Sequence, residues 1–188
     1  MLGILGCGGR GQAASTPPAD SAPATAATPT TQDSVSQGPP APTWISVDSA
    51  ARSVTLTLET AAGGPGSSAL INGYRNGGVR VVVPLGWTVR WAWRNGDSIA
   101  HSLVVMVQRE KIPLEGGRPA FSNAMTKEVT AGVPAGQTDQ TTFEADEAGW
   151  YWLLCGVPDH ALKGEWIELR VDREAKTAGI TIKAGGQG

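Results

Sequence analysis

The sequence predicts an all-β sandwich preceded by an extended N-terminal tether. Three observations support this: apolar and polar residues alternate along several short segments, glycine-rich breaks separate those segments, and the composition is poor in charge. Of 188 residues, 25 are glycine, 13 are proline and only 17% are charged. A charged fraction below about a quarter suits a loop-rich β protein better than a helical one. The length favours one folded domain with extensions.

The first seven residues, MLGILGC, form a short apolar run that ends at Cys7. The run resembles the lipobox before the lipidated cysteine of bacterial lipoproteins, but it lacks the basic residues of a secretory leader. Either the true start lies upstream of Met1 or the resemblance is accidental. We favour lipidation of Cys7, because a tether-like tract follows. The protein is then expected to be exported and membrane-anchored, facing the periplasm or cell exterior.

Residues 8–43 are expected to be that tether, a disordered linker. Alanine, proline, threonine, serine, glycine and glutamine dominate there, and no apolar periodicity could bury a face. The folded domain is expected over residues 44–188. A disulfide between Cys7 and Cys155 is not expected, because Cys7 lies beside the flexible tract and Cys155 in an aromatic-rich run.

Within the domain, apolar residues recur with the period of two that is typical of half-buried strands. Glycine pairs at 63–64 and 77–78, and Asn95 with Gly96, break the pattern at the spacing of an antiparallel sandwich. Residues 109–140 show little pattern and are too many for a hairpin turn, so we expect a structured insertion over the functional face. The expected strands are residues 54–59, 79–83, 89–94, 102–107, 141–144, 150–154, 165–171 and 180–183.

The charge of the chain argues against nucleic acid as a partner. The formal net charge is only -2, and neither sign forms a block that would bind a polyanion or a membrane. Membrane contact is expected through the lipid anchor alone. The binding partners of the protein must therefore be inferred from its candidate binding residues and not from its charge.

The chemistry concentrates in the segment AGWYWLLCGVPDHALKGEW, residues 148–166. A predicted strand delivers Cys155 to a short loop, the loop presents His160, and a second strand resumes at Glu165. His101 is the only other histidine of the chain. Taken singly, each residue has an ordinary alternative: an inert buried cysteine, a solvent-facing loop residue and a turn residue. Together, a thiolate and two imidazoles suit copper, because they satisfy both of its oxidation states.

This segment resembles the C-terminal ligand loop of cupredoxins. The upstream stretch SALINGYRNGGVRVVVPLGWTVRWAWRNGDSIAHSLVV looks like the first half of the same fold, and INGY, VPLGW, HSLV and CGVPDH are similar to sulfocyanin. The resemblance spans residues 67–171. It implies a Greek-key β-sandwich with one copper ion held by His101, Cys155 and His160. We expect a monomer that carries single electrons between redox proteins of a respiratory chain.

The sequence departs from the family at the axial position, where sulfocyanin-like sequences place a methionine and this chain has Glu165. Glu165 shares its strand parity with the apolar residues Ile167 and Leu169, so its carboxylate is expected to point inward and bind copper. A solvent-facing position at a frayed strand start is the alternative. Met106 falls on the face opposite His101. Met125, in the long insertion, stays open as a substitute.

Two other functions stay open. A glutamate donor favours a tetragonal site with an open position, as in red-copper relatives, and thus a small-ligand-binding or catalytic copper protein. The same donors also suit tetrahedral zinc or copper handling, although sparse methionine and histidine argue against copper exchange. A cysteine-histidine hydrolase is disfavoured, because no orienting residue or oxyanion loop is evident.

Overall fold

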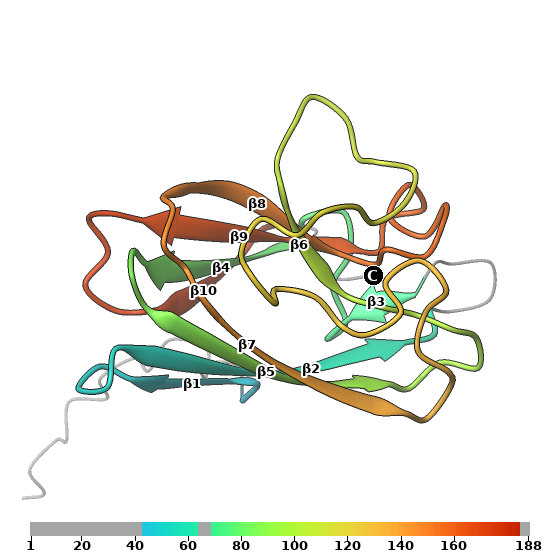
Figure 1. Ribbon diagram of the computed structural model, residues 1–188, viewed down its shortest axis with the longest axis horizontal. Helices are drawn as coiled ribbons and strands as arrows, with labels where there is room; N and C mark the ends of the chain where they lie inside the picture. Colours follow the sequence, from blue (N-terminus) through green and yellow to red (C-terminus); the bar gives the residue numbers. More distant parts are fainter. Residues whose placement is uncertain (1–42, 64–68, 185–188) are drawn as a thin grey trace, which may run out of the picture. The chain divides into compact units, whose positions relative to one another are not determined.

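The computed structural model describes residues 43–63 and 69–184, which form two β-sheets packed face to face (Figure 1). These residues contain strands and no helix, so the predicted all-β sandwich is confirmed. Within this described part there is accordingly no helix that could span a membrane. Cys7 and almost all of the predicted tether, residues 8–43, lie outside the described residues.

The first sheet has the strand order β1-β2-β5-β7, with β3 paired to β2. β1 and β3 were not predicted, since strands of four and two residues are too short to show alternation. The strands of this sheet are β1 (Ile45–Asp48), β2 (Ser53–Ala61), β3 (Leu70–Ile71), β5 (Thr88–Asn95) and β7 (Thr138–Glu144).

The second sheet has the order β10-β4-β9-β8-β6. Every strand predicted from the sequence is present in one sheet or the other, with ends that differ by a few residues. The strands of the second sheet are β4 (Val79–Pro84), β6 (Val104–Val107), β8 (Gly149–Leu154), β9 (Trp166–Asp172) and β10 (Gly179–Ile182).

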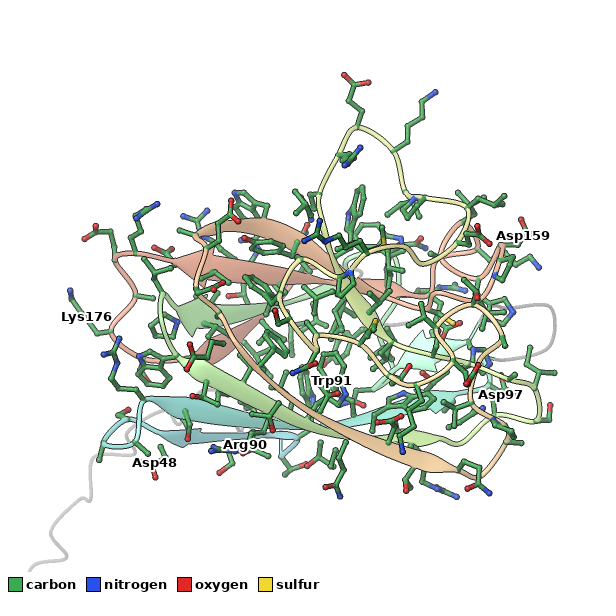
Figure 2. The ribbon with its side chains drawn as sticks, viewed as in Figure 1. Asp48, Arg90, Trp91, Asp97, Asp159 and Lys176 are labelled. Atoms are coloured by element: carbon green, nitrogen blue, oxygen red, sulfur yellow. The ribbon has the colours of Figure 1, made fainter. Side chains whose placement is uncertain are left out.

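Alternation along the strands builds one apolar core between the sheets. On β5, Trp91 and Trp93 are 2% and 1% exposed, whereas Arg90 between the strand's buried residues faces solvent. Figure 2 shows Trp91 between the sheets and Arg90, Asp48 and Lys176 on the outside. Complete burial of one large apolar side chain stabilises the fold by about 1.5–3 kcal/mol.

The expectation of an antiparallel sandwich is wrong at two strand pairs. β2 pairs with β5 in parallel, and so does β4 with β9. After β2 the chain makes β3 and then crosses to the second sheet for β4 before it returns as β5. Such a crossover brings a strand back in the same direction, which a hairpin turn cannot do. The alternation of apolar residues predicts strands but not their partners.

Residues 108–137, between β6 and β7, contain no strand, and hydrogen bonds join part of this segment to the loop that connects β8 and β9. Val133 in this segment forms an isolated bridge with His101. Gly116 N–H donates to the Gly156 carbonyl at 2.8 Å. The structured insertion predicted from the sequence is therefore present, and it lies against the residue that follows Cys155.

The contact at Gly116 leaves no room for a side chain. A Cβ atom there would lie 2.8 Å from the Gly156 Cα atom and would also overlap the Val129 side chain. Gly116→Ala should therefore lower the free energy of unfolding by roughly 1–3 kcal/mol, as overpacking does. Gly179→Ala is the control, because its Cβ would meet nothing within 4 Å, and it should change stability by less than about 0.5 kcal/mol. Urea unfolding measures both; equal midpoints would contradict the close packing.

Candidate metal centre

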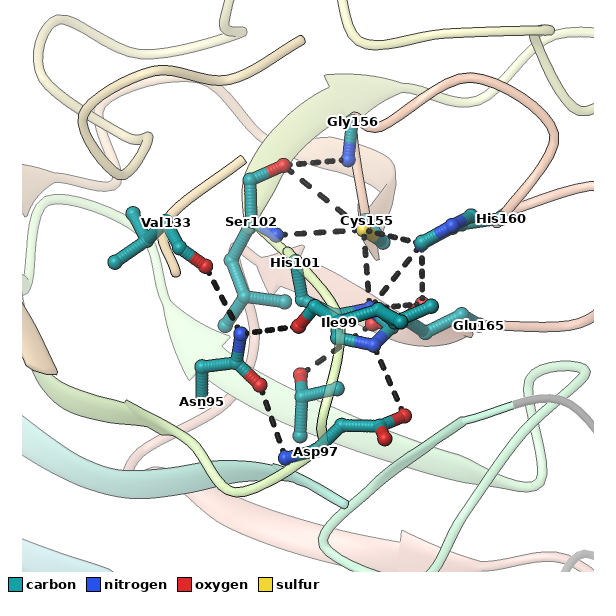
Figure 3. A network of polar contacts seen from close by, with 12 residues as sticks. Asn95, Asp97, Ile99, His101, Ser102, Val133, Cys155, Gly156, His160 and Glu165 are labelled. Atoms are coloured by element: carbon teal, nitrogen blue, oxygen red, sulfur yellow. Dashed lines mark hydrogen bonds and ion pairs between the residues drawn. The ribbon is translucent and has the colours of Figure 1, made fainter. Parts of the chain in front are cut away.

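Four side chains with metal-binding atoms meet at one end of the sandwich (Figure 3). They are His101, Cys155, His160 and Glu165, the four residues predicted from the sequence. One ligand atom of each lies within 4.8 Å of the others. The structure therefore brings all four predicted site residues together.

The β8–β9 connection places three of them. β8 ends just before Cys155, and Cys155 N–H donates to the Glu165 carbonyl at 3.0 Å, which extends the pairing of the two strands by one step. The chain between them folds into tight turns, and Gly164 adopts a φ of 106°, a conformation that L side chains rarely reach. This compact loop turns His160 back over Cys155, as the short spacing of the three residues predicts.

The ligand atoms converge on one small volume. Glu165 Oε2 lies 2.9 Å from His101 Nδ1 and 3.3 Å from His160 Nδ1, and the two Nδ1 atoms are 3.2 Å apart. Cys155 Sγ lies 3.5 Å from His160 Nδ1 and 3.8 Å from His101 Nδ1. One sulfur, two nitrogens and one oxygen that face each other fit a single cation, and a soft thiolate beside imidazoles selects copper or zinc.

Three of the four side chains are buried. Cys155 is 0%, His101 1% and Glu165 1% exposed, whereas the side chain of His160 is 15% exposed. The alternative of a solvent-facing Glu165 is therefore wrong, and the parity argument is correct. A cavity of about 210 Å³ borders the site and offers an entry path for an ion; it is lined by Ala69, Asp97, Ile99, His101, His160, Lys163 and Glu165.

The thiol of Cys155 is strongly protonated in the absence of a cation. Burial, followed by the negative charge of Glu165, raises its pKa to about 12, while hydrogen bonds from Ser102 act in the opposite direction. Ser102 N–H donates to Cys155 Sγ at 3.4 Å. A cation that binds the thiolate must therefore displace a proton.

His101 lies between two carboxylates. Its Nε2 atom is 3.1 Å from Asp97 Oδ2, while its Nδ1 atom faces Glu165. Burial acts to lower the pKa of His101, but Glu165 and then Asp97 raise it above its usual value. Burial likewise acts to raise the pKa of Asp97, but hydrogen bonds from Ser98 and His101 hold it below the usual value.

The second oxygen of Glu165 is held by the other sheet. Trp93 Nε1–H donates to Thr60 Oγ1 at 3.1 Å, and Thr60 Oγ1 donates to Glu165 Oε1 at 3.4 Å. With Oε1 engaged, Oε2 is directed at the histidines. A carboxylate so oriented would give a bound cation one oxygen ligand.

Sequence reasoning missed the supporting residues Asp97, Thr60 and Ser102. Asp97 stands four positions before His101, and that spacing is the one signal for it in the sequence. Met125 is 39% exposed and lines a different cavity. Met106 borders a cavity with Arg118 and Phe121. Neither methionine lines the cavity that borders the four-residue cluster.

A sequence model of the Sulfocyanin (SoxE) domain matches residues 40–182. A sulfocyanin from Sulfolobus acidocaldarius is 26% identical over 125 residues, which make up 63% of this chain and 63% of that relative. This chain therefore spans less than two thirds of the curated relative it matches.

Solved structures of copper proteins also resemble the domain. Reduced rusticyanin is 21% identical, with a TM-score of 0.42, over 64% of this chain and 85% of that chain. Dithionite-reduced auracyanin from Roseiflexus castenholzii is 22% identical, with a TM-score of 0.43, over 62% of this chain and 96% of that chain. A copper-containing nitrite reductase from Thermus scotoductus is 20% identical, with a TM-score of 0.46, over 64% of this chain but only 28% of that chain.

The pKa of the Cys155 thiol predicts proton release when copper binds. At pH 7 the thiol carries its proton, because its pKa is about 12. Copper uptake should therefore release about one proton from this thiol, and the apparent copper affinity should fall as pH falls. Calorimetric titration in buffers of different ionisation enthalpy counts the protons. Cys155→Ser should release about one fewer; an equal count in both proteins would show that the thiolate does not bind the ion.

Proposed function

This chain belongs to the sulfocyanin domain family, and from that premise we propose that it carries single electrons between redox proteins of a respiratory chain. Its fold is the cupredoxin-like β-sandwich, and proteins of this family bind one copper ion. In the described part of the chain, the cluster of His101, Cys155, His160 and Glu165 suits that ion. Bound copper would supply the one-electron chemistry.

The convergence of the four donors carries this proposal. A thiolate, two imidazoles and one further donor can bind both oxidised and reduced copper, so the ligands need to move little when an electron arrives. The protein can hold such a compromise only if the donors sit on rigid elements. Here Cys155 directly follows β8, Glu165 directly precedes β9, and the two residues are joined by a backbone hydrogen bond of 3.0 Å.

His160 provides the route for the electron in this proposal. Its side chain is 15% exposed, whereas Cys155 and Glu165 are buried. The loop that carries His160 is covered on one side by the segment of residues 108–137, through the Asp159 N–H bond to the Leu114 carbonyl at 2.9 Å. A partner that docks on this face would therefore meet the edge of His160 before any other donor.

The ligand role of Cys155 is tested by visible absorption of the copper-loaded protein. A thiolate bound to copper gives an intense charge-transfer band, and Cys155→Ser should abolish it because a hydroxyl cannot supply the sulfur orbital. Met125→Leu is the control and should keep the band, since Met125 lies on a different cavity. If the band survives in Cys155→Ser, or if wild-type protein has no such band, the proposed copper site is wrong.

The ligand role of Glu165 is tested by the reduction potential. An anionic oxygen donor favours oxidised copper more than a thioether does. Glu165→Met should therefore lower the ratio of oxidised to reduced protein at least tenfold at a fixed potential, which is a rise of about 59 mV for one electron. Glu168→Gln is the control, because Glu168 lies three positions further along, on β9, but binds Arg80 and Lys183. Equal potentials in wild type and Glu165→Met would show that Glu165 does not bind the metal.

A further inference from the structure

The far side of the His101 ring contacts a carboxylate that is not one of the four ligands. His101 Nδ1 faces the cluster, while Nε2 lies 3.1 Å from Asp97 Oδ2. The His101 side chain is 1% exposed and that of Asp97 only 11%. A charge-assisted hydrogen bond in such surroundings is poorly screened by water.

Asp97 is itself held in place. Asn95, which is 0% exposed, accepts a hydrogen bond from Asp97 N–H at 3.0 Å. The amide of Asn95 donates to the carbonyls of Ile99 at 2.7 Å and Val133 at 2.9 Å. Ser98 N–H donates to Asp97 Oδ1, which leaves Oδ2 directed at the imidazole. Figure 3 shows this chain of contacts from Asn95 through Asp97 to His101.

We propose that Asp97 is a positioning residue that orients His101 through Nε2 and biases the bound copper toward its oxidised state. This inference rests on the proposed function. A carboxylate that accepts the outer N–H of a metal-binding imidazole fixes the ring and makes its inner nitrogen a stronger donor. The four proposed ligands, which already include the Cys155 thiolate and the Glu165 carboxylate, do not themselves require the carboxylate of Asp97.

The bias follows from counting charges. The Cys155 thiolate and the Glu165 carboxylate balance the two charges of oxidised copper, while the histidines are neutral. After one electron arrives, the site carries one net negative charge. A further fixed negative charge on Asp97, at the outer nitrogen of a ligand, repels that electron in a region of low dielectric. Asp97 therefore stabilises the oxidised protein relative to the reduced protein.

The test compares two isosteric changes in the copper-loaded full chain. Asp97→Asn keeps an oxygen that can accept from His101 Nε2 but removes the charge. Asp159→Asn is the control, because it removes one charge from the residue next to His160. Asp159 is exposed on the outside of the loop (Figure 2). Asparagine tolerates the φ of 68° at this position. Asp97→Asn should lower the ratio of oxidised to reduced protein about tenfold at a fixed potential, a rise of about 59 mV. Asp159→Asn should change the ratio less than about twofold, because its charge is solvated.

A second readout follows the hydrogen bond itself. In proton–nitrogen NMR spectra of the reduced protein, the Nε2–H signal of His101 should exchange slowly in wild type and in Asp97→Asn. In Asp97→Ala it should exchange rapidly, because the acceptor is gone. If Asp97 only supported the loop, its substitution would change the stability of the protein but not the reduction potential of the copper.

The outcomes separate this inference from the proposed function. A protein that binds copper with the thiolate band, but in which Asp97→Asn and Asp159→Asn have equal potentials, would overturn the role of Asp97 alone. A His101 Nε2–H that exchanges rapidly in wild type would do the same. A protein that takes up no copper would overturn both.

Discussion

The buried carboxylate of Glu165 is the constraint on which the rest of the site depends. Glu165 is 1% exposed and precedes a strand whose inward side chains are apolar, where an uncompensated charge would cost several kcal/mol. Its compensation comes from two imidazoles at 2.9 Å and 3.3 Å and from Thr60. Two of these three partners are themselves candidate ligands. The arrangement that makes the carboxylate tolerable is therefore the one that gathers the donors around a cation.

The topology of the sandwich brings these partners together. Thr60 is near the end of β2 in the first sheet, and Glu165 directly precedes β9 of the second, 105 positions later. The parallel pairing of β2 and β5 places Asn95 at the end of β5 beside Thr60, and the turn that holds Asp97 and His101 follows directly after Asn95. Contacts at the site thus join both sheets, and the local chemistry depends on the packing of the whole domain.

Much of this could be predicted from the sequence, because the signals were local. Alternation predicts the strands, and parity predicts the inward direction of Glu165. The spacing of Cys155, His160 and Glu165 reflects one compact loop between paired strands. The parallel pairs could not be predicted, since alternation does not specify which strands are neighbours.

The support of His101 also could not be predicted. The direction of the Asp97 carboxylate depends on Asn95, which accepts a hydrogen bond from Asp97 N–H. The amide of Asn95 is held by the carbonyl of Val133, which belongs to the segment of residues 108–137, where the sequence shows no pattern. A contact made by an irregular segment produces no repeating pattern in the sequence. The residues that support the ligands are therefore harder to predict than the ligands themselves.

Rigidity and charge have separate consequences in this site. The position of Cys155 is set by the Ser102 backbone, and the Ser102 side chain is fixed by Gly156 N–H at 2.9 Å and the Val129 carbonyl at 2.6 Å. Donors held by the protein in this way need little rearrangement on electron transfer, which favours a fast reaction in both directions. The carboxylates act differently: in the roles proposed for them, Glu165 and Asp97 change the relative free energies of the two oxidation states without loosening the ligands. The fold can therefore set the rate of electron transfer through hydrogen bonds and the reduction potential through buried charge. A substitution that preserves the shape of a carboxylate but removes its charge changes only the reduction potential.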